Sequence, residues 1–211
     1  MNLQDSMIHP DVYPWLAGHW SFFVRRLRSE RLAHALMIAG PEDSGKLALA
    51  RGMVARLLCT QEQESACGEC RSCQLFEGGA HPDYFDVHPE EGSEVIKVDQ
   101  VRGLISSLEL TTSVSRRKVA FIHPAETMNS ASANALLKSL EEPAGDTVLI
   151  LVSHHPGRLP ITIRSRCQLI SVTQPDAKLV VDWLVGVSGK SADHVQAALQ
   201  AAGGSPMRAE Q

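Results

Sequence analysis

The chain has 211 residues with a formal net charge of −4, and its hydrophobic (44%) and charged (21%) fractions are ordinary for a soluble globular protein. This length fits one α/β domain with a smaller appendage, and the weak charge excludes strong attraction of the whole chain to nucleic acid. No apolar run is long enough to cross a membrane and no export signal is visible, so we expect a cytoplasmic protein.

An amphipathic helix is expected near the N-terminus, because large apolar residues recur there at helical spacing. The recurring residues are Val12, Trp15, Leu16, Trp20, Phe23 and Leu27. We interpret them as a helix face that packs on a sheet, in preference to an aromatic box for a cofactor.

A glycine-rich loop at 40–47 follows an apolar run at 35–39 and precedes a predicted helix at 46–58. This order of strand, loop and helix is the context of a phosphate-binding P-loop. Gly40 and Gly45 would allow the tight turn that presents backbone N–H groups to phosphate oxygens at the start of a helix. The stretch therefore predicts the shape of a nucleotide-binding loop.

The same loop lacks one of its chemical groups. Lys46 stands where the loop lysine would reach the outer phosphates, but Leu47 replaces the hydroxyl residue that would bind Mg²⁺. Leucine cannot bind a metal ion, so Mg²⁺ is not expected. The loop could hold the phosphates of ATP or ADP weakly without a metal ion, or it could be empty and held by packing; the sequence leaves both possibilities open.

Four cysteines, Cys59, Cys67, Cys70 and Cys73, fall within one short polar segment. In a chain expected to be cytoplasmic, such thiols favour metal ligation over disulfides. Tetrahedral zinc takes four thiolates, so we predict a structural Zn²⁺ centre at 59–73 with no open position for catalysis. An iron–sulfur cluster is the rival, although the last cysteine and proline of a ferredoxin-type run do not follow Cys73. Four free thiols are the remaining alternative.

Apolar runs and helical patterns then alternate, which is typical of a parallel sheet covered by helices. Besides 35–39, the predicted strands are 84–88, 119–122, 147–152 and 168–172. Predicted helices cover 98–110, 131–142, a segment beginning at Pro175, 192–201 and a segment that opens at 203. The polar stretch 90–94 and the turn-rich stretch 156–160 are interpreted as loops.

Arg116, Arg117 and Lys118 form a compact basic cluster before the strand 119–122. Such a cluster is either a solvated turn or a contact for the phosphate backbone of DNA. Because the chain is slightly acidic overall, any direct DNA contact would need a local patch of this kind. The sequence does not decide between the two interpretations.

The positions after the strand 119–122 hold His123 and Pro124. In P-loop ATPases this place supplies an aspartate for Mg²⁺ and often a glutamate that polarises water. Neither residue can replace them, so Mg²⁺-dependent hydrolysis is not expected. Glu126, two positions further on, is the substitute that an active ATPase could recruit, although the displacement changes the direction and reach of its carboxylate.

Taken together, these stretches resemble the clamp-loader family of AAA+ proteins over nearly the whole chain. The most specific segments are 31–36 (Arg-Leu-Ala-His-Ala-Leu), the four-cysteine insert, 81–83 (His-Pro-Asp), 134–143 (Asn-Ala-Leu-Leu-Lys-Ser-Leu-Glu-Glu-Pro) and 165–167 (Ser-Arg-Cys). The resemblance implies a P-loop AAA+ parallel sheet sandwiched by helices. Residues 1–173 would form the nucleotide-binding-like domain and 174–211 an incomplete helical lid. We expect a largely monomeric N-terminal fragment of a longer clamp-loader subunit.

The resemblance also implies roles for individual residues. Within this family the Ser-Arg-Cys segment carries an arginine finger that reaches the ATP site of a neighbouring subunit, which assigns this role to Arg166, next to Ser165. Ser153 matches the polar sensor residue after the fourth strand, and Arg208 matches the lid arginine that senses nucleotide. The alternative for Arg166 is an exposed arginine with no catalytic role. We interpret Cys167 as a small buried residue and not as a fifth metal ligand.

Members of the family that keep the fold and the finger but lack the P-loop hydroxyl and the acidic pair do not turn over ATP themselves, and this chain has their pattern. We therefore expect a non-hydrolysing stator in the clamp loader of the replicative polymerase, DNA polymerase III. The implied partners are the gamma/tau-type ATPase subunits and the delta subunit, with the sliding clamp and primed DNA reached through the assembly. Two alternatives stay open: an active ATPase that uses Glu126 or another, unrecognised acid, and a zinc-anchored protein-interaction module whose P-loop and Arg166 are idle.

Overall fold

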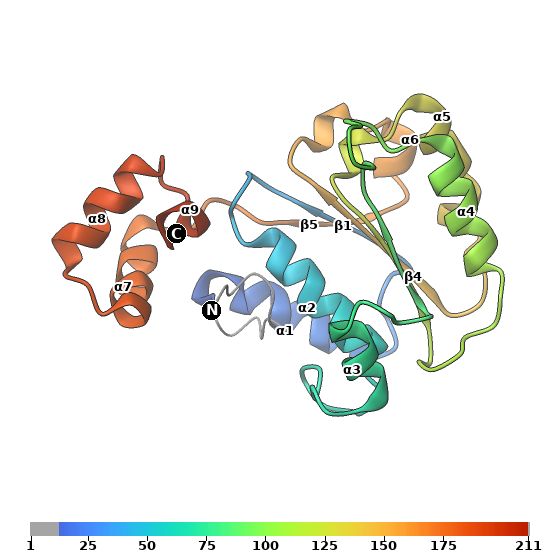
Figure 1. The fold of residues 1–211 in the computed structure, drawn as a ribbon, viewed down its shortest axis with the longest axis horizontal. Coiled ribbons are helices and arrows are strands. Elements are labelled where there is room, and N and C mark those ends of the chain that lie inside the picture. Colours follow the sequence, from blue (N-terminus) through green and yellow to red (C-terminus); the bar gives the residue numbers. More distant parts are fainter. Residues whose placement is uncertain (1–12, 211) are drawn as a thin grey trace.

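The computed structural model describes residues 13–210, and its core is a sheet of five strands (Figure 1). The strands are β1 (Ala35–Ala39), β2 (Tyr84–Val87), β3 (Lys118–Ile122), β4 (Thr147–Ser153) and β5 (Gln168–Ser171). The helices around the sheet are α1 (Ala17–Arg28), α2 (Lys46–Leu58), α3 (Arg71–Glu77), α4 (Val98–Leu108), α5 (Ser130–Glu141) and α6 (Ile161–Arg164), with 3₁₀ turns at Pro14–Leu16, Ala125–Thr127 and Pro156–Arg158. Val12, the first residue of the expected N-terminal helix pattern, lies outside the described residues.

The strands are ordered β2-β3-β4-β1-β5, and every neighbouring pair is parallel. Because all strands point the same way, the segments that leave β1, β3 and β4 meet at the carboxyl edge of the sheet, where α/β proteins bind their ligands. The segment leaving β1 is the predicted P-loop, and α2 follows it directly. The predicted α/β P-loop fold is confirmed.

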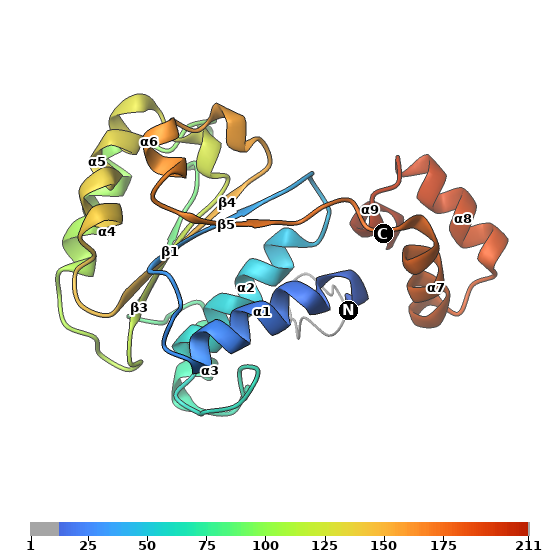
Figure 2. The ribbon, with the colours of Figure 1, turned by 180° about the vertical axis from the view of Figure 1, so that it is seen from behind.

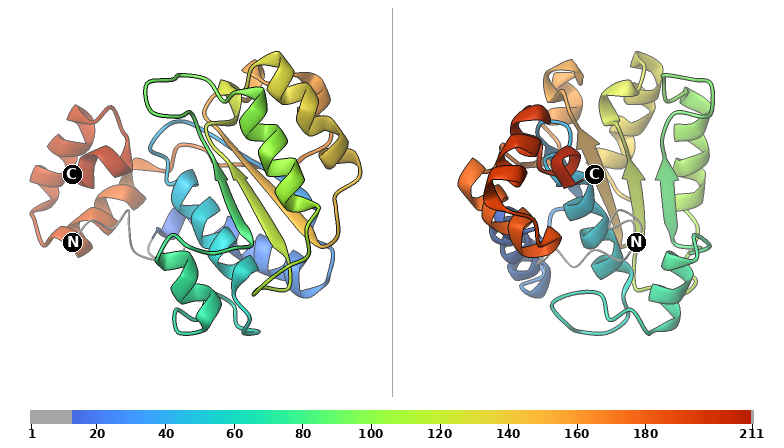
Figure 3. Two further views of the ribbon diagram at one scale, coloured as in Figure 1. Left: turned by 45° about the vertical axis from the view of Figure 1, so that its right-hand side comes forward. Right: turned by 60° about the vertical axis from the view of Figure 1, so that its left-hand side comes forward.

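Helices cover both faces of the sheet, as the continuous apolar strands require. Along β1 the side chains alternate: Leu36 and Ile38 belong to the core shared with α1 and α2, whereas Ala35 and Met37 belong to the core shared with α4 and α5. Figure 2 shows α1 and α2 together on one face, and the left view of Figure 3 shows α4 and α5 on the other. All five residues of β1 are buried, because the strand lies inside the sheet between β4 and β5 and is covered on both faces.

Three further helices, α7 (Ala177–Ser188), α8 (Ala192–Ala201) and α9 (Pro206–Glu210), follow β5 and lie beside the carboxyl edge of the sheet (Figure 1). They share a small core of Val180, Leu184, Val195 and Leu199. Trp183 of α7 meets Trp15 edge-on, with ring centroids 5.2 Å apart, which connects these helices to the segment before α1. Among the residues described, no helix is long and apolar enough to cross a bilayer.

Sequence periodicity does not predict two of the observed helices. α3 begins inside the cysteine segment, and α6 follows the turn-rich stretch; both are short, so neither shows a repeated apolar face. Some predicted ends also differ: the helix expected over 98–110 stops at Leu108, and the one expected from Pro175 starts at Ala177. The second difference has a local cause, because the Asp176 side chain caps α7 by accepting from backbone N–H groups of its first turn.

Candidate functional site

The loop after β1 needs both of its glycines for reasons visible in the backbone. Gly45 is the N-cap of α2 and has a φ of +86°, a left-handed conformation that glycine adopts without strain. A side chain at position 40 would place its Cβ only 2.1 Å from the carbonyl oxygen of Val172. Gly40 is therefore required by the close approach of the chain after β5, whether or not a phosphate binds.

The loop lysine is turned back onto the loop itself. Lys46 is 2% exposed, and its Nζ donates to the carbonyl oxygen of Pro41 at 2.6 Å. Burial lowers the pKa of Lys46, while the nearby carboxylates of Glu126, Glu42 and Asp43 oppose that shift. The amine thus has a protein partner at the place where a phosphate would otherwise be.

A small cavity lies beside the loop, with a volume of about 230 Å³. Its lining includes Tyr13, Gly45, Leu47, Arg51, His154 and Met207. Small-molecule sites usually measure about 300–1,000 Å³, so this cavity could enclose a phosphate group or part of a nucleotide but not a whole one. Leu47 borders it with an apolar side chain.

Aromatic side chains connect the P-loop to α7. The Trp15 ring nitrogen donates to the carbonyl oxygen of Ser44 at 3.0 Å, and the Trp15 ring packs against Tyr13 and Trp183. This agrees with the interpretation of Trp15 as a packing residue. The sequence does not reveal its hydrogen bond to the P-loop, because the partner is a backbone atom 29 positions away.

The residues after β3 have hydrogen-bond partners of their own. The His123 ring faces Asp86 on β2, with Nε2 2.9 Å from Oδ1. Glu126 lies nearer to Lys46, but its Oε1 accepts from the backbone amides of His154 (2.8 Å) and His155 (3.0 Å). Burial disfavours the charged carboxylate, yet these amides and the residue's own amide outweigh it and hold the pKa of Glu126 below its ordinary value.

Four buried side-chain atoms lack a hydrogen-bond partner within residues 13–210, and all four lie on the segments that leave β1, β3 and β4. They are Ser44 Oγ, Glu126 Oε2, Ser153 Oγ and His154 Nδ1. Buried polar atoms are usually paired, so this concentration at one edge of the sheet is unusual. The predicted sensor-like residue Ser153 belongs to this group and is fully buried.

The predicted lid arginine reaches the P-loop. Arg208 Nε lies 2.7 Å from Asp43 Oδ2, and its NH2 group lies 3.6 Å from Glu42 Oε2. The structure therefore brings Arg208 together with the loop, as a nucleotide-sensing position would require, but its present partners are two carboxylates of the loop.

The predicted finger lies far from this edge. Arg166 follows α6 and precedes β5, which puts it at the amino edge of the parallel sheet, whereas the P-loop leaves β1 at the carboxyl edge. The five residues of β1 separate the two edges by roughly 16 Å. Arg166 Nε donates to Glu141 Oε1 at 2.8 Å and NH1 donates to the Thr162 carbonyl oxygen at 2.9 Å, with Ser165 Oγ next to it at 3.5 Å.

The basic cluster before β3 is only partly available to a ligand. Lys118 is buried, and its ammonium donates to the Ser107 carbonyl oxygen. Arg117 pairs with Asp146 at 3.3 Å, and the exposed Arg116 pairs with Glu62 at 3.1 Å. Lys118 therefore has a structural role, and Arg116 is the member of the cluster most open to solvent.

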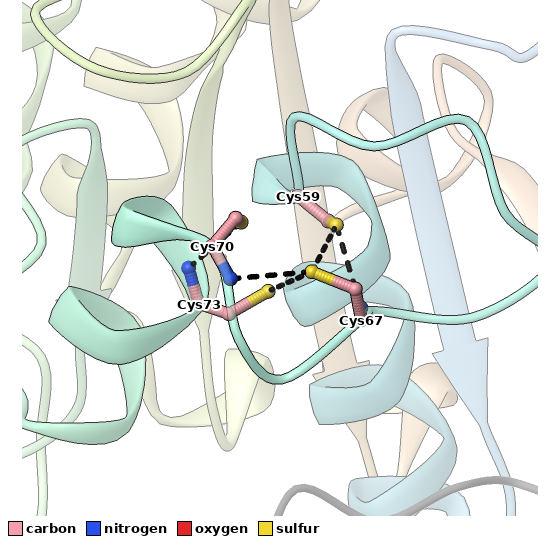
Figure 4. Close-up of side chains that lie close together, drawn as sticks. All are labelled: Cys59, Cys67, Cys70 and Cys73. Carbon is pink, nitrogen blue, oxygen red and sulfur yellow. Dashed lines mark hydrogen bonds between the residues drawn. The ribbon is translucent and has the colours of Figure 1, made fainter.

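The four predicted cysteine ligands come together (Figure 4). Cys59 and Cys67 have their sulfurs 3.7 Å apart, Cys67 and Cys73 have theirs 3.9 Å apart, and all four sulfurs lie within 4.8 Å of one another. A tetrahedron of sulfurs about 2.3 Å from a central zinc ion has edges of about 3.8 Å, so the arrangement fits such an ion. A disulfide would need sulfurs about 2.05 Å apart, and these are much further separated.

Backbone N–H groups also donate hydrogen bonds to cysteine sulfurs, which favours the thiolate form that binds a cation. Cys70 N–H donates to Cys67 Sγ at 3.3 Å, and Cys73 N–H donates to Cys70 Sγ at 3.4 Å. Burial opposes ionisation of Cys70, but hydrogen bonds from Thr60 and Cys73 outweigh it and lower the pKa of this thiol to about 6. Burial raises the pKa of Cys59 and Cys73, as expected for thiols that ionise only when a metal ion compensates their charge.

The four cysteines lie at the opposite end of α2 from the P-loop. Cys59 caps the C-terminal end of α2, and the 13 residues of α2 separate it from the loop by roughly 19 Å. Ser72 fixes α3 to this end, because its Oγ lies within hydrogen-bond distance of the Leu58 carbonyl oxygen (2.6 Å) and of His81 Nε2 (2.7 Å). His81 thus belongs to the support of the centre. The fifth cysteine, Cys167, packs elsewhere, against the α4–α5 core.

The sheet order, the strand–loop–helix at β1 and the helices beyond β5 define a P-loop α/β protein of the AAA+ class. A family model described as "DNA polymerase III, delta subunit" matches residues 17–176. The chain belongs to this family. The predicted resemblance to clamp-loader proteins is therefore confirmed.

Curated relatives agree with the family. The DNA polymerase III subunit delta' of Pseudomonas aeruginosa is 46% identical over 202 residues, covering 95% of this chain and 61% of the relative. The delta' subunit of Escherichia coli is 38% identical over 195 residues, covering 92% and 58%. The chain thus spans about 60% of the length of these relatives. The tau/gamma subunit of Haemophilus influenzae is 34% identical over 142 residues, covering 67% of this chain and 20% of the relative.

Solved structures with low identity share the fold. A gamma subunit-related protein of DNA polymerase III from Thermotoga maritima matches with a TM-score of 0.52 and 20% identity, covering 86% of this chain and 61% of that chain. The RuvB branch-migration motor of Thermotoga maritima matches with a TM-score of 0.58 and 17% identity, covering 92% and 58%. Both structures support the α/β architecture.

Proposed function

We propose that this chain is part of a delta'-type clamp-loader subunit that does not hydrolyse ATP itself but donates Arg166 to the ATP site of a neighbouring subunit. The observation that carries the proposal is the separation of Arg166 from its own P-loop by the length of β1. A guanidinium at the amino edge of the sheet can assist phosphoryl transfer only in a site that another subunit brings to it. Ser165 and Thr162 beside it would help to position the guanidinium.

The chain's own loop supports the non-hydrolysing part of the proposal. Leu47 provides no hydroxyl for Mg²⁺, and the His123 ring is engaged with Asp86. The carboxylate of Glu126 is oriented by two backbone amides, so Glu126 would have to leave them to polarise a water molecule. The alternative of an active ATPase that recruits Glu126 is therefore less well supported than the stator.

A contact with Glu141 would hold the finger in the free subunit. Arg166 and Glu141 are both partly exposed, with 34% and 49% of the side chains accessible. Exposed ion pairs contribute about 0–1 kcal/mol, so a triphosphate in a neighbouring site could displace Glu141 at small cost. The contact with Glu141 would thus give Arg166 a defined position before the subunit joins its partners.

For the cysteine centre we propose a structural Zn²⁺ ion bound by Cys59, Cys67, Cys70 and Cys73. Four sulfurs at tetrahedral spacing leave no open position, so the ion would order the polar segment and take no part in catalysis. The separation of the centre from the P-loop by the length of α2 supports that division. A zinc-anchored interaction module is the alternative in which this centre, and not Arg166, carries the function.

We further propose that the chain divides into a nucleotide-binding-like domain of residues 1–173 and a helical lid of residues 174–211. Its proposed partners are gamma/tau-type ATPase subunits and the delta subunit, with the sliding clamp and primed DNA met through the assembly. As a replication protein of bacteria it would act in the cytoplasm. On its own, this chain would be largely monomeric, which a mass independent of concentration in sedimentation equilibrium would support.

The unpaired buried atoms favour a second candidate activity, weak binding of phosphate or of ADP at the P-loop without Mg²⁺. Ser44 Oγ on the P-loop and His154 Nδ1, whose ring lies close enough to Lys46 to feel its charge, are unpaired, and a phosphate could pair them. Calorimetric titration of ADP into the wild-type protein and into Lys46→Ala tests this. Binding that is lost in the variant supports the activity, and equal or absent binding in both proteins rejects it.

Clamp loading tests the main proposal. The full-length subunit carrying Arg166→Ala is assembled with its partner subunits, the clamp and primed DNA, and Arg164→Ala serves as a matched control because Arg164 is an exposed arginine two positions away. We expect both variants to assemble as judged by gel filtration, and only Arg166→Ala to load clamps slowly. Equal loading by both variants would reject the finger and favour the interaction module.

A further inference from the structure

The structure also brings together Asp86, His88 and His123, which come from two strand ends and have no part in the proposed finger or zinc centre. Asp86 lies on β2 and His88 directly follows its last residue, two positions further on, so the two side chains point to the same side. β2 and β3 pair Val87 with Ile122, and the amide of His123 donates to the Val87 carbonyl oxygen at 3.0 Å. This register places His123 opposite His88.

One oxygen of Asp86 faces both imidazoles. Oδ1 lies 2.9 Å from His123 Nε2 and 3.4 Å from His88 Nδ1, and the three ligand atoms lie within 4.8 Å of one another. Nitrogen and oxygen ligands about 2.0–2.2 Å from a tetrahedral metal ion are about 3.3–3.6 Å apart, which is close to this spacing. The three side chains therefore need only small adjustments to share one ion.

Neighbouring residues already orient these groups. The Tyr84 hydroxyl donates to Asp86 Oδ2 at 3.1 Å, which leaves Oδ1 directed at the imidazoles. Gln100 of α4 donates to the His88 carbonyl oxygen at 2.8 Å and so fixes the backbone that carries this imidazole. Support of ligands by surrounding hydrogen bonds is characteristic of metal sites.

Solvent can reach the group. The side chains of His88, Asp86 and His123 are 57%, 32% and 19% accessible, so an ion could enter from water and keep water as its remaining ligand. Two imidazoles and one carboxylate suit late divalent transition-metal ions, whereas Mg²⁺ prefers oxygen ligands alone.

From this geometry we propose that Asp86, His88 and His123 form a second metal site, selective for Zn²⁺ and similar divalent transition-metal ions over Mg²⁺. It lies on the edge strand pair β2–β3, apart from the four cysteines. The proposal does not depend on Arg166 or on ATP.

Counting bound zinc by equilibrium dialysis tests the site, with untagged full-length protein so that no added histidines compete. We expect two Zn²⁺ ions per chain in the wild type, one in His88→Gln and in His123→Gln, and two in His194→Gln, which removes an exposed histidine of α8. Cys70→Ser should lose the other ion, and the two losses should add. Mg²⁺ should not compete for either position.

Calorimetry on protein whose cysteine centre is already filled gives the affinity. Tyr84→Phe keeps the ring and removes the hydroxyl, so zinc binding should weaken about 10-fold, as for other groups that support metal ligands. A wild-type chain that binds only the zinc lost in Cys70→Ser would overturn the proposal. It would also be overturned if His88→Gln and His123→Gln bound zinc as the wild type does while remaining folded by circular dichroism, since the group would then be a hydrogen-bond network alone.

Discussion

Arg208 and Asp43 are 165 positions apart in the sequence, yet Nε of the arginine lies 2.7 Å from the carboxylate of the P-loop residue. This ion pair connects the last described helix, α9, with the loop after β1. Trp15 supports the same junction from the other side through its bond to the Ser44 carbonyl oxygen. Side chains of the chain itself thus connect the helices beyond β5 to the loop.

We predict that Arg208→Ala loosens this junction locally. Because the pair is largely exposed, the free energy of unfolding should fall by no more than about 0.2–1 kcal/mol, while amide hydrogen exchange in the loop 40–47 should become faster. Lys178→Ala is the control, since it breaks an exposed ion pair with Asp182 inside α7. Unchanged exchange in the loop of Arg208→Ala, or equal acceleration in the control, would contradict the connection.

We predict that Cys70→Ser removes the ion of the cysteine centre and destabilises the segment between α2 and α3. Metal binding contributes to folding where the segment has no core of its own. Metal content by plasma emission spectrometry and the thermal unfolding midpoint should both fall. Cys167→Ser is the matched control, because Cys167 lies in another core, and it should keep the ion. A zinc content of Cys70→Ser equal to that of the wild type would exclude the four-sulfur centre.

Asp83 should be important for stability at neutral pH. Its carboxylate accepts from the amides of Ser113, Val114 and Ser115, each at 2.8 Å, and it is fully buried. Asp83→Asn should lower the free energy of unfolding by about 1–3 kcal/mol, because amide groups lose a charged partner. The exposed Asp99→Asn should have little effect.

Asp83 should also make the stability of the protein depend on pH. Burial opposes ionisation, but the backbone hydrogen bonds dominate and hold the pKa of Asp83 below its ordinary value in the folded state. Its contribution to stability is therefore complete above the pKa of the unfolded chain, about 3.9, and is lost as the pH falls through the lower folded pKa. Urea unfolding at several pH values should show the gap between wild type and Asp83→Asn closing in acid. A gap that stays constant would be inconsistent with this assignment.

Restoring the P-loop hydroxyl alone should not create an ATPase. Leu47→Thr supplies the missing side chain, but His123 and Pro124 still provide neither acid after β3. Assays of phosphate release by the isolated variant with Mg²⁺ should stay at background. Turnover that appears in Leu47→Thr and disappears again when Glu126→Gln is added would favour the active-ATPase alternative.

The strands and the main helices were predictable because each is a continuous apolar run or a repeated apolar face. The P-loop, the four cysteines and the Ser-Arg-Cys segment were predictable because each is contiguous or closely spaced. α3 was not predictable, because it has no repeated apolar face. Hydrogen bonds of Ser72 and of the cysteine sulfurs hold this short helix in place.

Contacts between distant residues could not be predicted. Nothing in the sequence pairs Arg166 with Glu141, although Glu141 lies within the segment 134–143 that carried the resemblance. The sequence shows His123 only as a residue that cannot replace the acid expected after β3, and only the β2–β3 register places it opposite His88. The same limit applies to Lys46, whose acceptor is a backbone carbonyl, because any residue at position 41 has one.

Steady-state ATP turnover of the assembled loader tests the central claim most directly. The full-length subunit is supplied as wild type, Arg166→Ala or Arg164→Ala, at saturating clamp and primed DNA. A finger contributes roughly 10³-fold or more at the site it serves, so Arg166→Ala should silence the one site that faces this subunit and lower total turnover, with assembly and the Arg164→Ala control unchanged. Turnover in Arg166→Ala equal to that of the wild type would contradict the account.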